Sequence, residues 1–408
     1  MLQAGTKPTS SSFHVSKDGY TSCDTPQNDR GQRPPPGINI EIAYDTTILS
    51  VREIGPFQGV PVIAPGFIDG QVNGYGGLDV NSADVSPQTI INLSAELAKL
   101  GVTTWVPTIV TASEEAITVA LEQIKRACDI DPTTRAAIPC VHIEGPFISD
   151  QDGPRGVHDA AFVRPLDADE IRRWLRASGM VGIVTVSPHT PDAPAQIARI
   201  RELGVEVAIG HTHASPEQIT AAITAGAGLA THLGNGIATT LPRHPNALWT
   251  QLADDRLTAG LIADGHHLPS DTLKVMIRAK TPSALIWCLT APHWPVARLA
   301  ATALPWAASW ISLLAGGSPT WVRTCSRGRR YPPGRIPQRD PQRRPGATGG
   351  PQNGDVHSRP GDSGHPAGLG HLRVGSPADF VLITGEGPGA GTITEVIQSG
   401  RKVSGGPE

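Results

Sequence analysis

The stretch VEVAIGHTHASPEQITAAITAGAGLATHL, residues 205–233, decides the fold. VEVAIGHT predicts a strand, SPEQITAAITAG predicts a helix that begins at a serine cap and ends at a glycine, and GLATHL predicts a second strand. Two strands that are joined through a helix lie parallel in one sheet. Each of these strands ends in a histidine, His211 or His232.

The same alternation of strand and helix extends from about residue 63 to residue 280. Repeated crossovers predict a parallel α/β sheet, and so many in one domain favour a closed (β/α)8 barrel of the TIM type over an open sheet. In such barrels the chemistry lies at the carboxyl ends of the strands. We expect strands at 60–74, 102–110, 140–145, 182–188, 205–212, 228–233 and 257–265, and helices at 86–101, 113–128, 167–179, 192–204, 215–226 and 269–280.

The two ends of the chain have a different pattern. Residues 1–36 are polar, which predicts a disordered leader without the apolar core of a signal peptide. Short alternating runs between Gly-rich turns predict that 37–64 and 372–408 form a small β-sandwich domain. The barrel would then occupy residues 65–285 and be incomplete, because residues 286–371 lack any periodicity.

Composition argues against several classes of partner. A net charge of −3 over 408 residues favours neither nucleic acid nor an anionic membrane. The five cysteines form no CxxC pair, which is typical of a reducing compartment, and we expect the cytoplasm. The uncharged run at 299–322 is long enough to cross a bilayer, but its prolines, glycines and mid-chain position argue against a membrane span.

Three polar side chains close three of the expected strands. Glu144 ends CVHIE, His211 ends VEVAIGH and His232 ends GLATH. One carboxylate and two imidazoles at one barrel mouth form a three-ligand set for Zn²⁺ or Fe²⁺, with a position left for water. Each residue alone is more simply a helix cap or a hydrogen-bonded histidine, but the three together favour a metal site.

Other loops at the same end carry further polar residues. DGQVNG at 69–74 holds the amides Gln71 and Asn73, where many metal-dependent hydrolases with this barrel carry His-x-His. Amides ligate Zn²⁺ poorly, so we expect one metal ion per chain rather than two. Arg and His on such loops suit a phosphate or carboxylate of the substrate. The candidates are His158, Asn235, Arg243 and His267.

The motifs PGFIDGQVNG, GVTTWVPTIVT, HIEGPFI, GHTHA, ATHLGN, IADGHH and LRVGSPADFVLI occur together, from about residue 64 to 280 and again near the C-terminus. Through them the chain resembles N-acetylglucosamine-6-phosphate deacetylase of the amidohydrolase superfamily. The resemblance implies hydrolysis of the sugar amide to glucosamine 6-phosphate and acetate. It also implies, in some members, a homodimer.

The resemblance assigns roles to particular residues. One divalent metal would be held by Glu144, His211 and His232, and an aspartate after the last barrel strand would act as general base and then protonate the leaving amine. The residues that would contact the substrate are Val157, His158, Asn235 and Gly236 for the sugar, and Arg243 and His267 for the phosphate.

Two features depart from the family pattern. The family usually has Asn-Ala where this chain has Asn235-Gly236. More importantly, no aspartate lies between Asp271 and Asp340, so the expected catalytic aspartate is absent. The composition changes in the same region, since residues 284–372 contain ten Arg, three Asp, no Lys and no Glu.

Loss of a single base after the Ile286 codon accounts for both changes. Trp is encoded only by TGG, so the earlier frame must read valine across Trp287 and Cys288, and it then permits serine and aspartate. That frame reads L-V-S-D after Ile286, as the family does. We therefore predict a frame-shifted, disordered segment near 286–371 and impaired activity. The alternatives are an inactive chain that binds metal or sugar phosphate, and an amidohydrolase with another acylated substrate.

Overall fold

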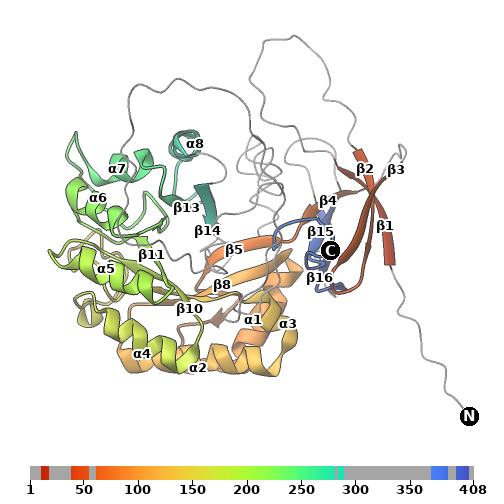
Figure 1. The fold of residues 1–408 in the computed structure, drawn as a ribbon, viewed down its shortest axis with the longest axis horizontal. Coiled ribbons are helices and arrows are strands. Elements are labelled where there is room, and N and C mark those ends of the chain that lie inside the picture. Colours follow the sequence, from red (N-terminus) through yellow and green to blue (C-terminus); the bar gives the residue numbers. More distant parts are fainter. Residues whose placement is uncertain are drawn as a thin grey trace, which may run out of the picture.

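Two sheets organise the chain in the computed structural model. It describes residues 11–17, 38–54, 61–280, 284–288, 369–384 and 392–403, with 11–17 described by their backbone alone. An eight-stranded parallel sheet and a seven-stranded sheet are formed, together with a short hairpin of β6 (Gly74–Tyr75) and β7 (Leu78–Asp79). Figure 1 shows the two large sheets beside each other.

The eight-stranded sheet confirms the expected barrel. Its strands pair in parallel in the order β14-β13-β12-β11-β10-β9-β8-β5. Strand β14 also contacts β5, so the two ends of the sheet meet and the barrel is nearly closed. The strands are β5 (Phe67–Val72), β8 (Val102–Val110), β9 (Val141–Glu144), β10 (Val181–Val186), β11 (Glu206–Ile209), β12 (Leu229–Ala230), β13 (Thr258–Ile262) and β14 (Leu285–Cys288).

The last strand extends beyond the point at which we expected the barrel to break. β14 continues through Ile286 to Cys288, and its four residues pair with β13 in register from Ala259 to Ile262. A short apolar strand needs only a neighbouring edge with free backbone groups, and LIWC provides both the length and the β-forming residues. Residues 289–368, which make up most of the segment predicted to be disordered, lie outside the described residues.

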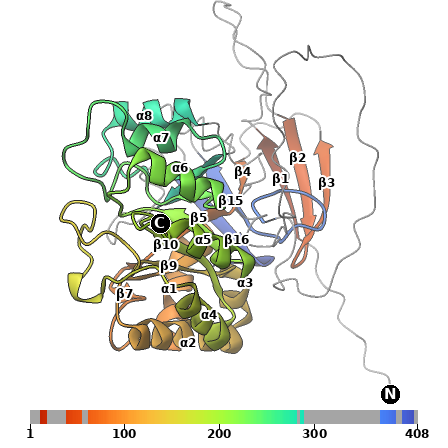
Figure 2. The same ribbon diagram turned by 60° about the vertical axis from the view of Figure 1, so that its left-hand side comes forward.

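Helices cover the outer surface of the barrel, as Figures 1 and 2 show. Ser86 and Ser215 cap the helices that follow them, each with a complete capping box, as serine caps predict. The helices α3 and α7 were not expected, because each is too short for an amphipathic period to be read. The helices are α1 (Pro87–Lys99), α2 (Glu114–Ile130), α3 (Pro132–Ala137), α4 (Ala168–Ser178), α5 (Ala193–Glu202), α6 (Pro216–Thr224), α7 (Ala247–Ala253), α8 (Ser270–Ala279) and the 3-10 turn Ala160–Phe162.

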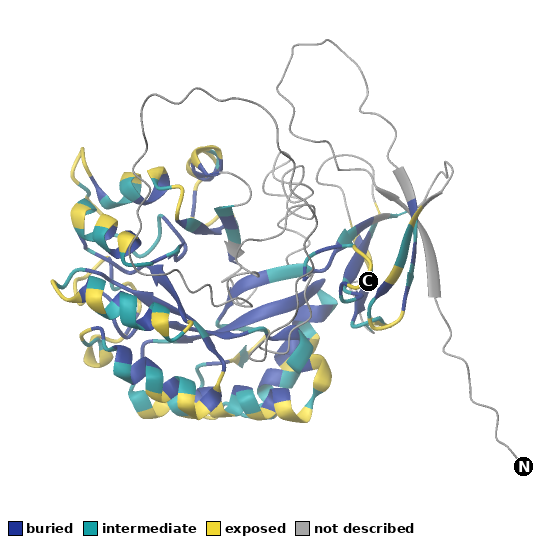
Figure 3. Cartoon of the chain, in the orientation of Figure 1, coloured by how far each residue is buried: buried dark blue, intermediate teal, exposed yellow. Residues whose placement is uncertain are grey.

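Apolar side chains fill both faces of the barrel sheet. Figure 3 shows the strands buried and the outward faces of the helices exposed. The main core lies between strands and helices and includes the fully buried Trp105 and Trp174. A smaller cluster closes the inside of the barrel, so the polar residues above it are confined to one end. Its buried members are Val106, Cys140, Ile183, Ala208 and Leu229, with Ile68 and Ile286 packed against them.

The seven-stranded sheet joins the two ends of the chain. The ring centroids of Tyr44 and Phe380 lie 5.1 Å apart, so β2 packs onto β15 although two strands separate them in the hydrogen-bonding order. The sheet therefore curls over its own core, as a small sandwich does. In order, the strands are β17 (Arg401–Lys402), β16 (Thr392–Gln398), β15 (Phe380–Thr384), β4 (Val62–Pro65), β1 (Ser11–Lys17), β2 (Ile38–Tyr44) and β3 (Ile48–Ile54).

One stretch of the expected disordered leader has a defined backbone. Residues 11–17 form β1, which pairs antiparallel with all of β2. The alternation of Phe13 and Val15 with polar residues in SSFHVSK is the period of a strand, a local pattern that the polar composition of residues 1–36 conceals. Within the described residues, no helix has the length and apolar character needed to cross a membrane.

Candidate metal centre

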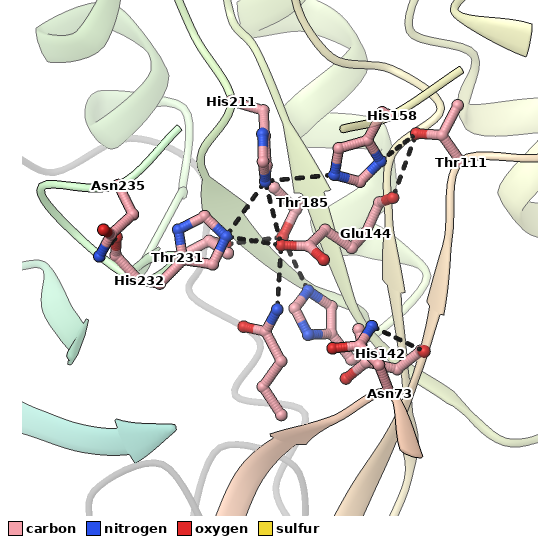
Figure 4. Close-up of polar contacts among 12 residues, drawn as sticks. Asn73, Thr111, His142, Glu144, His158, Thr185, His211, Thr231, His232 and Asn235 are labelled. Carbon is pink, nitrogen blue, oxygen red and sulfur yellow. Dashed lines mark hydrogen bonds and ion pairs between the residues drawn. The ribbon is translucent and has the colours of Figure 1, made fainter. Parts of the chain in front are cut away.

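The three expected ligands converge at the carboxyl end of the barrel. Glu144 is the last residue of β9, and His211 and His232 each lie two residues beyond a strand, β11 or β12. The Oε1 atom of Glu144 lies 2.8 Å from Nε2 of His232 and 3.2 Å from Nε2 of His211, and the two Nε2 atoms lie 3.1 Å apart. All three side chains are buried, and Figure 4 shows them directed toward one point.

Both histidines have backbone conformations that L-residues rarely adopt. His211 has φ 47° and His232 has φ 25°. Such conformations cost about 1–3 kcal/mol each, and they persist where the surrounding structure holds them, typically at functional sites. Both rings of this strained pair contact Glu144.

The donor atoms fit a divalent cation. Nδ1 of His211 lies 2.9 Å from the carbonyl oxygen of Pro154, and a carbonyl can only accept a hydrogen bond. With a metal bound, Nδ1 would carry the proton of His211, and Nε2 would present its lone pair to the cation beside Oε1 of Glu144 and Nε2 of His232. Lone pairs meet in this way around a shared cation, and tetrahedral Zn²⁺ with bonds of about 2.0–2.2 Å would hold its ligand atoms about 3.3–3.5 Å apart.

The charge state of Glu144 suits the same role. Burial alone would raise the pKa of this carboxyl, but the facing imidazoles of His211 and His232 outweigh burial and hold the pKa well below its usual range. Glu144 is therefore an anion. Its Oε1 also accepts a hydrogen bond of 3.0 Å from Nε2 of Gln71, so Gln71 orients the carboxylate.

His158 adds a fourth nitrogen to the cluster. Its Nε2 lies 3.3 Å from Nε2 of His211, and its Nδ1 lies 2.9 Å from Oγ1 of Thr111. Glu144, His158 and His211 together satisfy the spacing of a metal-binding group. Burial and the neighbouring His211 lower the pKa of His158 to about 4, so its ring is neutral at physiological pH.

Two more of the expected residues lie beside the cluster. The side-chain amide of Asn235 donates a hydrogen bond of 3.3 Å to the carbonyl oxygen of His232. Gly236 has φ 59°, and a Cβ atom there would lie 2.9 Å from Nδ1 of His211. Glycine at this position, where the family usually has alanine, therefore allows the loop to approach His211 closely.

The remaining expected residues have exposed side chains on the surrounding loops. Val157 is fully exposed, and Arg243 is exposed on the segment before α7. His267 is also exposed, but its Nδ1 is held 2.6 Å from Oδ2 of Asp264. No described contact joins Val157, Arg243 or His267 to the Glu144 cluster.

Residues beneath the cluster were missed in the sequence. Nε2 of His142 lies 2.7 Å from Oγ1 of Thr185, which lies 2.6 Å from Oγ1 of Thr231 (Figure 4). This buried chain links β9 and β10 to the residue before His232, and burial lowers the pKa of His142 to about 4. A signal was available, because His142 and Glu144 are two residues apart in one strand and share a face.

The fold and the cluster together define a parallel α/β barrel with a Glu/His/His group at the carboxyl end of its strands. No protein-family model matches the chain. N-acetylglucosamine-6-phosphate deacetylase of Bacillus subtilis is 30% identical over 228 residues, which are 55% of this chain and 57% of that protein. N-acetylgalactosamine-6-phosphate deacetylase of a Shewanella species is 32% identical over 218 residues, 53% of this chain and 54% of that protein. The chain thus matches little more than half the length of these curated relatives.

The structural comparison extends over most of the chain. The crystal structure of N-acetyl-D-glucosamine-6-phosphate deacetylase from Mycobacterium smegmatis aligns with a TM-score of 0.68 and 25% identity, and the alignment covers 90% of this chain and 95% of that one. These comparisons confirm the resemblance to N-acetylglucosamine-6-phosphate deacetylases that the sequence motifs indicate.

Proposed function

We propose that the site is built to remove the acetyl group from N-acetylglucosamine 6-phosphate, yielding glucosamine 6-phosphate and acetate. The observation that carries this proposal is the convergence of Glu144, His211 and His232 at the barrel mouth. The names of the relatives support an N-acetylated amino-sugar 6-phosphate as substrate class. The relatives act, by their names, on either the glucosamine or the galactosamine derivative, so N-acetylgalactosamine 6-phosphate is a second candidate substrate.

In this proposal Glu144, His211 and His232 hold one divalent ion, Zn²⁺ or Fe²⁺. When bound, such an ion supplies Lewis-acid polarisation of the amide carbonyl and lowers the pKa of a water ligand. The protein's own groups orient the ligands: Gln71 donates to Glu144, and the carbonyl of Pro154 accepts from Nδ1–H of His211. His232 has no such partner, since its buried Nδ1 meets no hydrogen-bonding group in the described part of the chain.

The substrate's sugar and phosphate are assigned to the loops around the cluster. Neutral His158, beside His211, offers a hydrogen bond to the sugar or its amide, and Asn235 and Gly236 line the same approach, with exposed Val157. Arg243 and His267 are assigned to the phosphate, because guanidinium and imidazole N–H groups donate hydrogen bonds to phosphate oxygens. Asp264 supports this role, since its contact with Nδ1 of His267 leaves Nε2 of that ring available.

The expected catalytic aspartate is absent from the sequence, and in this proposal its place lies just beyond strand β14. Ile286 packs against the cluster inside the barrel. The thiol of Cys288 is buried, and its pKa is raised well above the usual value by burial and by the carboxylates of Asp69 and Glu144. Side chains alternate along a strand, so position 290 is the next on this inward face. The restored frame would place aspartate there; the present residue, Thr290, lies outside the described residues.

A general base that is missing costs about 10²–10⁴-fold in rate, so we propose that the chain as it stands is an impaired deacetylase. A cytoplasmic location and a homodimer belong to the same proposal. The test is acetate release from N-acetylglucosamine 6-phosphate with added Zn²⁺ or Fe²⁺, in parallel with N-acetylgalactosamine 6-phosphate. Release from neither sugar by a chain with a restored frame would refute the proposed function.

A further inference from the structure

A second pair of histidines lies at the same end of the barrel but outside the Glu144 cluster. His189 follows β10 and His213 follows β11, and their ring centroids are 4.4 Å apart with an interplanar angle of 37°. Both rings are half-buried. None of the roles assigned above uses either residue.

A buried serine fixes each ring. Nδ1 of His189 lies 2.7 Å from Oγ of Ser187, and Nδ1 of His213 lies 2.6 Å from Oγ of Ser149. Both serines are almost fully buried, with 2% and 0% exposure, so they are firm anchors. Metal-ligating histidines typically have this arrangement, with one ring nitrogen fixed by a hydrogen bond and the other turned outward.

The hydrogen bonds also identify the protonated nitrogen of His189. The hydroxyl of Ser187 donates its single proton to Oγ1 of Thr212 at 2.8 Å. Ser187 must therefore accept from Nδ1–H of His189, and a neutral His189 ring carries its lone pair on Nε2. That atom is the one that a metal ion would bind.

The Nε2 atoms of both rings have no hydrogen-bond partner among the residues that the structure describes. Burial and the neighbouring His213 lower the pKa of His189, which keeps the ring in the neutral form. The exposed carboxylate of Asp150 acts electrostatically on His189 in the opposite direction, and it adds negative charge beside the pair.

We propose that His189 and His213 form a second, weaker site for a divalent transition metal, with Zn²⁺, Ni²⁺ and Cu²⁺ as the chemical class. The two Nε2 atoms bind the ion and water completes its coordination, since imidazole suits these metals. The simpler account is a packed pair of histidines that is satisfied by the serines and by water. The two accounts differ in whether both rings bind one ion.

Metal titration of the full-length chain distinguishes them. Protein that retains its tightly held ion after dialysis is titrated calorimetrically with Zn²⁺, and Cu²⁺ bound to the second site is examined by electron paramagnetic resonance. We expect a second, weaker equivalent of metal and a Cu²⁺ spectrum with two imidazole nitrogens. Absence of a second equivalent would overturn the proposal.

Variants tie the second equivalent to these residues. His189→Ala and His213→Ala should each abolish it, and Ser187→Ala should weaken it by about 10–100-fold, because the ring loses its anchor. The matched control is His244→Ala, an exposed histidine on another loop, which should leave it unchanged. Unaltered binding in His189→Ala and His213→Ala, with circular dichroism showing that both are folded, would refute the site. His211→Ala should lose the tightly held ion but keep the second equivalent. Failure of the proposed deacetylase site can therefore be distinguished from failure of the His189–His213 site.

Discussion

Nε2 of His232 lies 2.8 Å from Oε1 of Glu144, although 88 residues separate them in the chain. They meet because β9 and β12 are parallel strands of one barrel and both residues stand at carboxyl ends. Neither residue alone indicates a metal, and their convergence with His211 does so because three ligand atoms gather around one point.

The first prediction concerns metal content. Because Glu144, His211 and His232 share one ion, purified protein should retain about one tightly held Zn²⁺ or Fe²⁺ per chain after dialysis. His211→Ala should lose it, whereas His244→Ala should not. Elemental analysis by mass spectrometry measures both. Two tightly held ions per chain, or full metal content in His211→Ala, would contradict the assignment.

The second prediction concerns the hydroxyl chain below the site. Thr185→Val removes the link between His142 and Thr231, which holds strand β10 and the backbone before His232 in place. We expect metal affinity to fall by about 10–100-fold. Thr185→Ser keeps the hydroxyl and should retain affinity, as should Thr108→Val, whose hydroxyl contacts only its own strand. Equal metal affinity in Thr185→Val and the unaltered chain would show that the network has no positioning role.

Much of this architecture was predictable because it depends on local patterns. The serine caps at Ser86 and Ser215 and the strand that ends at Glu144 follow from residues a few positions apart. What was missed depends on tertiary context: β1 is a strand because β2 lies beside it, and Thr111, Thr185 and Thr231 become site residues only when distant strands meet. Exposure of Arg243 likewise depends on how its loop folds.

The third prediction tests the phosphate loops. Glucosamine 6-phosphate should bind more tightly than glucosamine. Arg243→Ala should lower the affinity for the phosphorylated sugar by about 10–100-fold, because a hydrogen bond to a charged group contributes about 1.5–3 kcal/mol. Arg256→Ala is the control, because Arg256 is exposed and paired with Asp254 away from these loops. Calorimetry gives the affinities. Equal affinity for the two sugars would exclude a phosphate site.

The fourth prediction is a pH dependence of stability that arises from Asp379, next to β15 of the seven-stranded sheet. Burial raises the pKa of Asp379 to about 6, although the backbone N–H of Ser399 donates to it at 2.6 Å. The folded state therefore binds the proton more tightly than the unfolded state does. The stability that this group contributes is fully present below about pH 4 and is lost as pH rises through about 6, by up to about 3 kcal/mol.

Asp379→Asn isolates that contribution. Asparagine cannot ionise, so the variant should lose less stability than the unaltered chain between about pH 4 and pH 7. Urea unfolding at several pH values measures the difference in the free energy of unfolding. Parallel pH profiles for the two proteins would mean that Asp379 titrates normally.

The most direct test of the account is acetate release from N-acetylglucosamine 6-phosphate, with added Zn²⁺, by two forms of the protein. One is the chain as it stands. The other has one cytosine inserted after the Ile286 codon and the frame restored downstream, so that it reads I-L-V-S-D. We expect little or no turnover from the first and turnover in the range typical of enzymes, about 1–10³ s⁻¹, from the second. Turnover in that range by the unrepaired chain would show that the aspartate is dispensable and would contradict the account.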